Sequence, residues 1–406
     1  MMTFKTSQKS ITSELLLWRE TSTQVSVMDT YEQKVHPISS LFNDGAINFD
    51  IPPQPKGMLS NIEVVTTFKI KKGGSNLTAE NQCTVVNNFA NALWELVEIK
   101  VSDRVDIMQS MRNSYAYQTF FDYTLNSDVN REDYLFTEQL FKMDSGTTKD
   151  DSEVVVFTGD GVRNKAAADR AKRVAKSKAV TVSSRLHCPL LTTSKALPSN
   201  MRIRVSFLKN ADKFLLIADD EDYKVEIQDV YLNVTFTRPY DHLLQIIEER
   251  LQKQPAPYYV SKPELIIKPI AQSGRIVRLN NLFPAKLPKH AFFCVQRSKD
   301  FDGSFDSNPF TFVPFGKFQL YIDGKPYFND TLEIDHTTEN SAKMYHENMV
   351  FLKQLYKTIG KDVKGCGLIN SKNFQQNFIV GVSFTTDRSS SMVPYLSHQP
   401  STRFRL

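Results

Sequence analysis

The densest run of chemistry-bearing residues in this sequence is basic and extends from Arg163 to Lys178 (RNKAAADRAKRVAKSK). Seven Lys and Arg side chains stand there beside a single acid, Asp169, and five alanines favour a helix. Such a patch could bind phosphate groups through ion pairs that salt weakens. The candidate phosphate-contacting residues are Arg170, Lys172, Arg173 and Lys176.

A simpler interpretation of the same run is a solvated helix within a loop insertion, and we favour it. No aromatic residue interleaves the basic ones, as a surface that stacks on nucleic-acid bases would require. Direct contact with nucleic acid is therefore not expected.

Catalytic and cofactor motifs are missing from the sequence. There is no GxxxxGK[ST] phosphate loop, no GxSxG elbow and no HExxH, and the seven histidines are scattered. The acidic runs Asp219–Asp222 and Asp300–Asp306 lack the spaced oxygen ligands of a calcium loop and indicate solvated turns. We predict no catalytic residue, no metal, no cofactor and no small-molecule substrate, so the protein is not expected to be an enzyme.

Composition sets the broad class. The chain has 406 residues, 41% of them hydrophobic and 23% charged, with a net charge of +5, which excludes an acidic disordered protein and a strongly basic nucleic-acid coat. The four cysteines form no CxxC pair, so zinc ribbons and thioredoxin-like sites are excluded. The first residues lack the pattern of a secretory signal, and we expect folding in a reducing compartment.

The elements that position these residues are mostly strands. Short runs of β-branched and aromatic residues alternate with Pro, Gly, Asn and Asp from Ile47 onward. In Met201–Phe207 the odd positions are apolar and the even ones polar, and Val97–Val101 alternates in the same way. Strict alternation predicts antiparallel sheets with one buried face, and it disfavours a parallel nucleotide-binding fold.

Three segments have helical spacing instead: Tyr115–Leu125, Tyr240–Gln254 and Ala342–Ile359. The middle one follows Pro239 and ends at Pro255, which marks it as a connector between two parts. We therefore predict an N-terminal arm at 1–44, a first unit at 45–238, a connector helix at 239–257 and a second unit at 258–406.

The two units resemble each other in the order of their features. Trp94–Val101 is followed by a turn at Ser102-Asp103 and then an aromatic helix, and Phe318–Ile322 is followed by a turn at Asp323-Gly324 and then a second helix. Asp-Gly between alternating runs is a strong hairpin signal. Two copies of one β-rich unit are predicted.

Several stretches also resemble a known family. In the first unit they are Trp94–Val101, Tyr115–Phe120, Ser183–His187, Leu197–Val205, Phe214–Leu216 and Tyr223–Leu232. In the second unit they are Leu279–Lys289, Phe301–Phe310 and Leu320–Lys325. The sequence is similar there to the double jelly-roll major capsid (hexon) proteins of the Polinton or Maverick, adintovirus and adomavirus type.

This resemblance implies an all-β fold of two tandem eight-stranded antiparallel jelly rolls, a double jelly roll, with a few short helices in loops. It implies a structural subunit that forms a homotrimer, a pseudo-hexagonal capsomer, in the shell of an icosahedral DNA virus. The expected partners are neighbouring capsomers and minor or penton capsid proteins. The expected location is the virion, with synthesis in the host cytoplasm and assembly in the host nucleus.

Three alternatives stay open from the sequence. Jelly rolls also serve as cellular binding proteins such as lectins, although no clustered His or spaced Asp and Asn indicates a sugar or metal site. The second alternative is a nucleic-acid-binding factor that uses Arg163 to Lys178. The third is a minor capsid protein, and two full units argue against a single-roll vertex protein.

Overall fold

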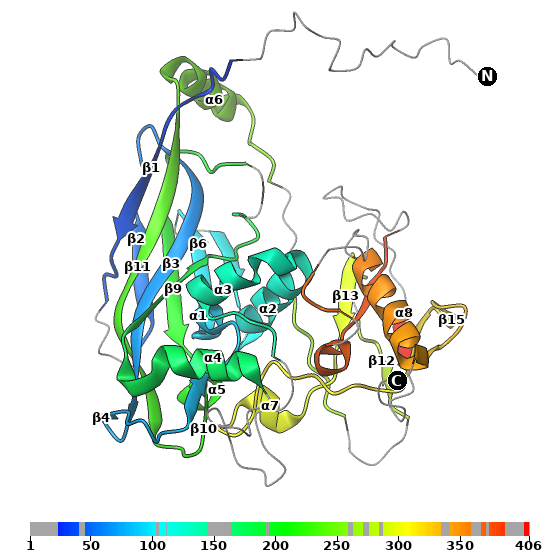
Figure 1. Ribbon diagram of the computed structural model, residues 1–406. Helices are drawn as coiled ribbons and strands as arrows, with labels where there is room; N and C mark the ends of the chain where they lie inside the picture. Colours follow the sequence, from blue (N-terminus) through cyan, green and yellow to red (C-terminus); the bar gives the residue numbers. More distant parts are fainter. Residues whose placement is uncertain are drawn as a thin grey trace, which may run out of the picture.

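A computed structural model shows two β-rich units side by side, with α2 between them (Figure 1). The structure describes residues 23–39, 45–102, 105–110, 112–144, 164–191, 193, 195–258, 263–270, 276–283, 287–333, 342–358, 367–370, 373–385 and 402–405.

The larger sheet of the first unit is antiparallel, in the order β1-β11-β3-β4, with β8 also paired to β3. Its strands are β1 (Val27–Val35), β3 (Met58–Lys72), β4 (Ser75–Asn76), β8 (Val180–Arg185) and β11 (Tyr223–Pro239). Along β3 the apolar side chains Ile62, Val64, Phe68 and Ile70 are almost fully buried. One face of this sheet therefore covers the core, as alternation predicts.

A second sheet packs over the same core in the order β2-β9-β6-β7. Its strands are β2 (Ile47–Ile51), β6 (Trp94–Val101), β7 (Val105–Gln109) and β9 (Ile203–Lys209), and β5 (Cys83–Val85) and β10 (Leu216–Ala218) form a short separate ladder. The predicted alternation in β9 is confirmed, because Ile203, Val205 and Phe207 are buried while Arg204 is exposed. Trp94 packs against Phe207 with ring centroids 4.9 Å apart.

Short helices fill the connections of the first unit. They are α1 (Phe89–Ala92), α2 (Ser114–Asn126), α3 (Glu132–Gln139), α4 (Lys165–Val174) and α5 (Asp212–Leu215), with the 3-10 turns η2 (Val129–Arg131) and η3 (Ala175–Ser177). The Asn164 side chain caps α4 by accepting a hydrogen bond of 3.1 Å from the amide of Ala167. The predicted helices at Tyr115–Leu125 and Tyr240–Gln254 are confirmed as α2 and as α6 (Asp241–Lys253).

The second unit has shorter described strands. Its elements are β12 (Arg278–Asn280), β13 (His290–Phe293), α7 (Ser298–Asp302), β14 (Lys317–Ile322), β15 (Lys325–Pro326), β16 (Leu332–Glu333), α8 (Ala342–Thr358), η4 (Phe374–Asn377), β17 (Val380–Ser383) and β18 (Thr402–Arg405). Asp323 and Gly324 both have positive φ, 49° and 79°, and they join β14 to β15. The predicted Asp-Gly hairpin is therefore confirmed.

The predicted duplication is visible in the strand pairing. One sheet of the first unit has the strand order β2-β9-β6-β7, and one sheet of the second unit has the order β12-β18-β14-β15. Strands at corresponding positions in these two sheets also follow one another in the same order along the chain. The pair β3 and β8 likewise corresponds to β13 and β17. In each unit the hairpin is followed by a helix, α2 in one and α8 in the other.

The prediction of an arm at 1–44 is wrong for one stretch. β1 lies within it and pairs with β11 from Val27 to Val35, so this stretch belongs to the first sheet. This strand could not be predicted from apolar alternation, because β1 is an edge strand and most of its side chains are exposed. Residues 1–22, including the Leu15–Trp18 cluster, lie outside the described residues.

Candidate functional site

A dense set of buried contacts joins the two units, and we take this junction as the candidate functional site. Within the described ranges, no group of three or more His, Cys, Asp and Glu side chains is arranged to hold a metal ion. A search of those ranges also finds no helix with the length and hydropathy needed to span a membrane.

The apolar part of the junction is an aromatic face of α2. Tyr117, Phe120, Phe121 and Thr124 recur at helical spacing and meet the second unit. The stacked pairs are Tyr117–Phe301, Phe120–Phe310 and Phe121–Phe312, with ring centroids 5.8, 4.7 and 5.6 Å apart. The amide of Leu368 donates a hydrogen bond of 2.8 Å to the Thr124 carbonyl at the end of the same face. Ring stacking beyond simple burial contributes about 0.5–1.5 kcal/mol per pair.

A second contact requires a glycine. Gly303 follows α7 with φ of 76°, and a Cβ there would lie 2.8 Å from the Cα of Phe214 in the first unit. Nearby, the amide of Ala218 donates a hydrogen bond of 2.6 Å to the Phe305 carbonyl. The backbones of the two units therefore touch without room for a side chain.

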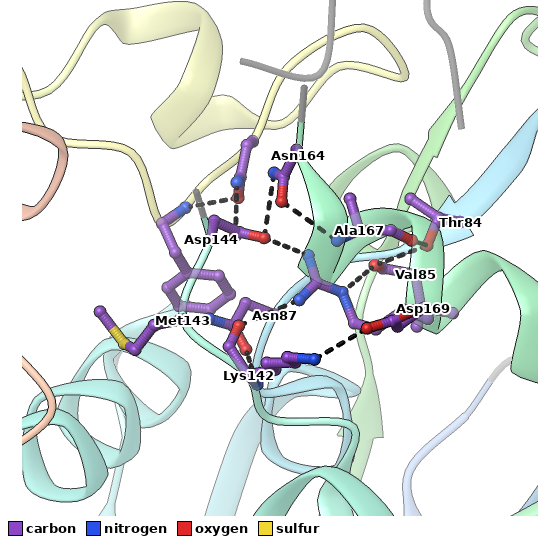
Figure 2. A network of polar contacts seen from close by, with 12 residues as sticks. Thr84, Val85, Asn87, Lys142, Met143, Asp144, Asn164, Ala167 and Asp169 are labelled. Carbon is purple, nitrogen blue, oxygen red and sulfur yellow. Dashed lines mark hydrogen bonds and ion pairs between the residues drawn. The ribbon is translucent and has the colours of Figure 1, made fainter. Parts of the chain in front are cut away.

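The polar part of the junction centres on Asp144 (Figure 2). Its Oδ1 accepts hydrogen bonds from Arg170 Nη2 at 2.6 Å and from Asn164 Nδ2 at 3.1 Å, and its Oδ2 accepts one from Asn308 Nδ2 at 2.9 Å. Asn308 belongs to the second unit, and its Oδ1 accepts a hydrogen bond from the Phe310 amide. One carboxylate thus connects α4, the loop before it and the aromatic junction.

The structure corrects the sequence interpretation of Arg170. Its side chain is fully buried, and its guanidinium donates to the carbonyls of Val85 and Lys142, at 3.0 and 3.1 Å, as well as to Asp144. Because these acceptors lie inside the fold, Arg170 cannot contact a phosphate at the surface. Inclusion of Arg170 in the candidate patch is wrong.

A signal for this burial was present in the sequence. Ala167, Arg170, Ala171 and Val174 recur at helical spacing, and the apolar members of that stripe are buried. An arginine on the alanine face of a helix is expected to point into the protein, where it needs a carboxylate partner.

The other members of the candidate patch, Lys172, Arg173 and Lys176, are exposed on the opposite side of α4 and on η3. Lys172 Nζ lies 3.4 Å from Asp169 Oδ1, and the Arg173 guanidinium lies over the ring of Phe136, 5.4 Å from its centroid. Contact of these three side chains with phosphate stays a prediction.

Asp169 supplies a testable pH dependence. Lys142 Nζ lies 2.7 Å from its carboxylate, and this hydrogen bond holds the pKa of Asp169 below its usual range. A folded-state pKa below the unfolded value, about 3.9, stabilises the fold above that pH and loses this contribution as the pH falls through the folded pKa. We therefore expect Asp169→Asn to lower the melting temperature at pH 7, and to lower it by progressively less as the pH falls below about 3.9. Asp133→Asn, at an exposed carboxylate of α3, is the matched control, and an effect of Asp169→Asn that stays equal as the pH falls would contradict the assignment.

A histidine, a carboxylate and a tyrosine meet at the end of α2. His187 Nδ1 lies 3.0 Å from Asp122 Oδ2, and His187 Nε2 lies 2.8 Å from the Tyr123 hydroxyl. Burial raises the pKa of Tyr123 to about 12, which makes the phenol a poorer nucleophile, and Gln139 Nε2 donates to the same hydroxyl. Through these contacts His187, which follows β8, connects that strand to the end of α2.

The two units, with the same strand order and a shared buried junction, define the class: the chain has the double jelly-roll fold. A chain of the Sputnik virophage structure superposes with a TM-score of 0.53 at 11% identity, covering 98% of this chain and 85% of that chain. The capsid protein chains of the virus PBCV-1 are comparable. VP54 gives a TM-score of 0.54 at 12% identity over 96% of this chain and 86% of that chain, and a chain of the PBCV-1 virus capsid gives 0.53 at 10% identity.

At such identities these neighbours establish the fold, and they are double jelly-roll major capsid proteins of large DNA viruses and virophages. Among curated proteins, the uncharacterized protein F54H12.2 of Caenorhabditis elegans is 21% identical over 288 residues, 68% of this chain. The matched region spans 61% of that relative's length. No family model matches the chain.

Proposed function

We propose that the protein is the major capsid subunit of an icosahedral DNA virus. The observation that carries this proposal is the buried junction that joins two like rolls. A subunit that presents two similar rolls at a fixed angle supplies six similar positions when three copies close around an axis, which suits a hexagonal lattice. The stacked aromatic pairs and the Asp144 network are what fix that angle here.

The finer assignment follows the stretches named in the sequence analysis. Their similarity to the Polinton or Maverick, adintovirus and adomavirus type supports a subunit of that type, a homotrimeric capsomer and contacts with neighbouring capsomers and minor or penton proteins. We propose the virion as its location, after synthesis in the host cytoplasm and assembly in the host nucleus. We propose no enzymatic activity for the chain.

The experiment that tests the proposal measures the oligomer of the purified protein. We expect light scattering after size exclusion to give three times the chain mass, because each subunit supplies two of the six rolls. Negative-stain images of the same peak should show particles with a hexagonal outline. A stable monomer at micromolar concentration, or a dimer, would contradict the capsomer and favour a cellular binding protein.

A further inference from the structure

A surface hollow of about 180 Å³ lies where the last turns of α3 and α4 meet the start of β8. Its lining includes two cationic side chains, Arg173 and Lys178, and two hydroxyls, Thr137 and Thr181, and it includes no carboxylate. The mixture of two cations and hydroxyls in one concave surface is typical of a site for an oxyanion.

The two cations lack internal compensation. The only acid of α4, Asp169, is already bound by Lys142 at 2.7 Å and by Lys172 at 3.4 Å. In the part of the chain that the structure describes, no ion pair reaches Arg173 or Lys178. Both charges are therefore available to an anion from solution.

Arg173 is also held in position before any ligand arrives. Arg173 lies over the ring of Phe136 at 5.4 Å, and Lys142 lies over the same ring at 5.5 Å. Such cation–π contacts restrict the long side chain of Arg173. Because two cations cover Phe136, this ring is not open for stacking on a nucleic-acid base.

Lys178 follows a turn with unusual backbone geometry. Lys176 and Ser177 both have positive φ, 56° and 53°, a conformation that costs non-glycine residues free energy. The Ser177 hydroxyl secures the turn, because it donates a hydrogen bond of 2.5 Å to the Ile70 carbonyl and accepts one of 2.7 Å from the Leu77 amide. The fold maintains this turn, which places Lys178 at the hollow.

Thr181 can contribute a donor. Its hydroxyl lies 2.9 Å from that of Thr67, so it can accept from Thr67 and donate its own hydrogen outward. The Thr137 hydroxyl, by contrast, donates its hydrogen to the Asp133 carbonyl, so Thr137 lines the hollow without offering that hydrogen to a ligand.

We propose that this hollow binds a small phosphate anion, with Arg173 and Lys178 as the charged contacts and Thr181 as a hydroxyl donor. The hollow is smaller than the roughly 300–1,000 Å³ of typical organic-ligand sites, so it fits a phosphate or diphosphate group and not a whole nucleotide. This proposal goes beyond the capsid role and does not depend on it.

The test is calorimetric titration of the full chain with inorganic pyrophosphate at low ionic strength. We expect the double variant Arg173→Ala, Lys178→Ala to weaken binding at least tenfold, and Thr181→Val to weaken it less. Lys165→Ala is the matched control, because it removes an exposed cation at the other end of the same helix, outside the lining of the hollow, and should leave the affinity unchanged. Melting temperatures of all variants near that of the unmodified protein show that the fold is kept.

Three outcomes would overturn the proposal. Absence of pyrophosphate binding, or equal binding by the double variant, removes the site. A single-stranded oligonucleotide that binds more tightly than pyrophosphate and is lost equally in the Lys165→Ala variant would assign the charge of α4 and η3 to nucleic acid instead. Orthophosphate and a phosphomonoester, titrated separately, distinguish a free anion from a phosphorylated compound as the source of the bound group.

Discussion

Replacing Arg170 with alanine is expected to lower the free energy of unfolding by about 3–5 kcal/mol. The substitution removes a fully buried guanidinium and leaves Asp144, whose side chain is 14% exposed, without the cation that pairs with it among the described residues. It also leaves the carbonyls of Val85 and Lys142 without these donors inside the protein. The measurement is urea unfolding followed by circular dichroism.

The controls separate a buried ion pair from general damage to α4. Lys172→Ala on the same helix should change the free energy of unfolding by less than about 0.5 kcal/mol, because Lys172 is 72% exposed. The double variant Arg170→Met, Asp144→Leu removes both charges and should recover part of the loss. If Arg170→Ala costs no more than Lys172→Ala, the buried network does not hold the junction.

The same arginine shows where sequence reasoning stops. The run from Arg163 to Lys178 reveals its charge and its helix, both of which follow from local composition. The partner of Arg170 is Asp144, 26 residues away, and the link onward to Asn308 spans 164 residues. No local pattern encodes such contacts, so a uniform basic patch was inferred where the fold divides one buried cation from several exposed ones.

Most of the strands, by contrast, could be predicted from local sequence. Alternation in β6 and β9 was sufficient to predict antiparallel sheets, because burial on one face dictates it. The repeated unit was predicted from the shared order of strand, turn and helix, which includes the Asp-Gly turn after β14. β1 escaped detection, since an edge strand has no such requirement for burial on one face. The aromatic spacing of α2 predicted a helix, but not that its aromatic face packs on the other unit, because the same spacing would serve a core within one roll.

That aromatic face gives the second large effect. Phe310→Ala is expected to cost about 3–5 kcal/mol, because the ring is 3% exposed and packs against Phe120, Tyr117 and Phe214 of the first unit. Unlike a substitution inside one roll, it removes contacts that couple the two units. The loss should therefore change the cooperativity of unfolding as well as its midpoint.

Tryptophan fluorescence and circular dichroism together can detect this change in the cooperativity of unfolding. The chain has two tryptophans, Trp18 and Trp94, so in a Trp18→Phe background fluorescence reports only Trp94, which is buried in the first unit. Circular dichroism reports both units. We expect the two urea transitions to coincide in the parent protein and to separate in Phe310→Ala, because the units then unfold with less mutual support.

The matched control is Phe49→Ala, which removes an equally buried ring that packs on Phe207 within the first roll. Phe49→Ala should lower the free energy of unfolding by a similar amount. Because it leaves the stacked pairs of the junction in place, the two units should still unfold together. Coincident transitions in Phe310→Ala, or a wider separation in Phe49→Ala, would mean that the aromatic face of α2 does not couple the rolls. The fixed angle that the capsomer requires would then have to come from the Asp144 network alone.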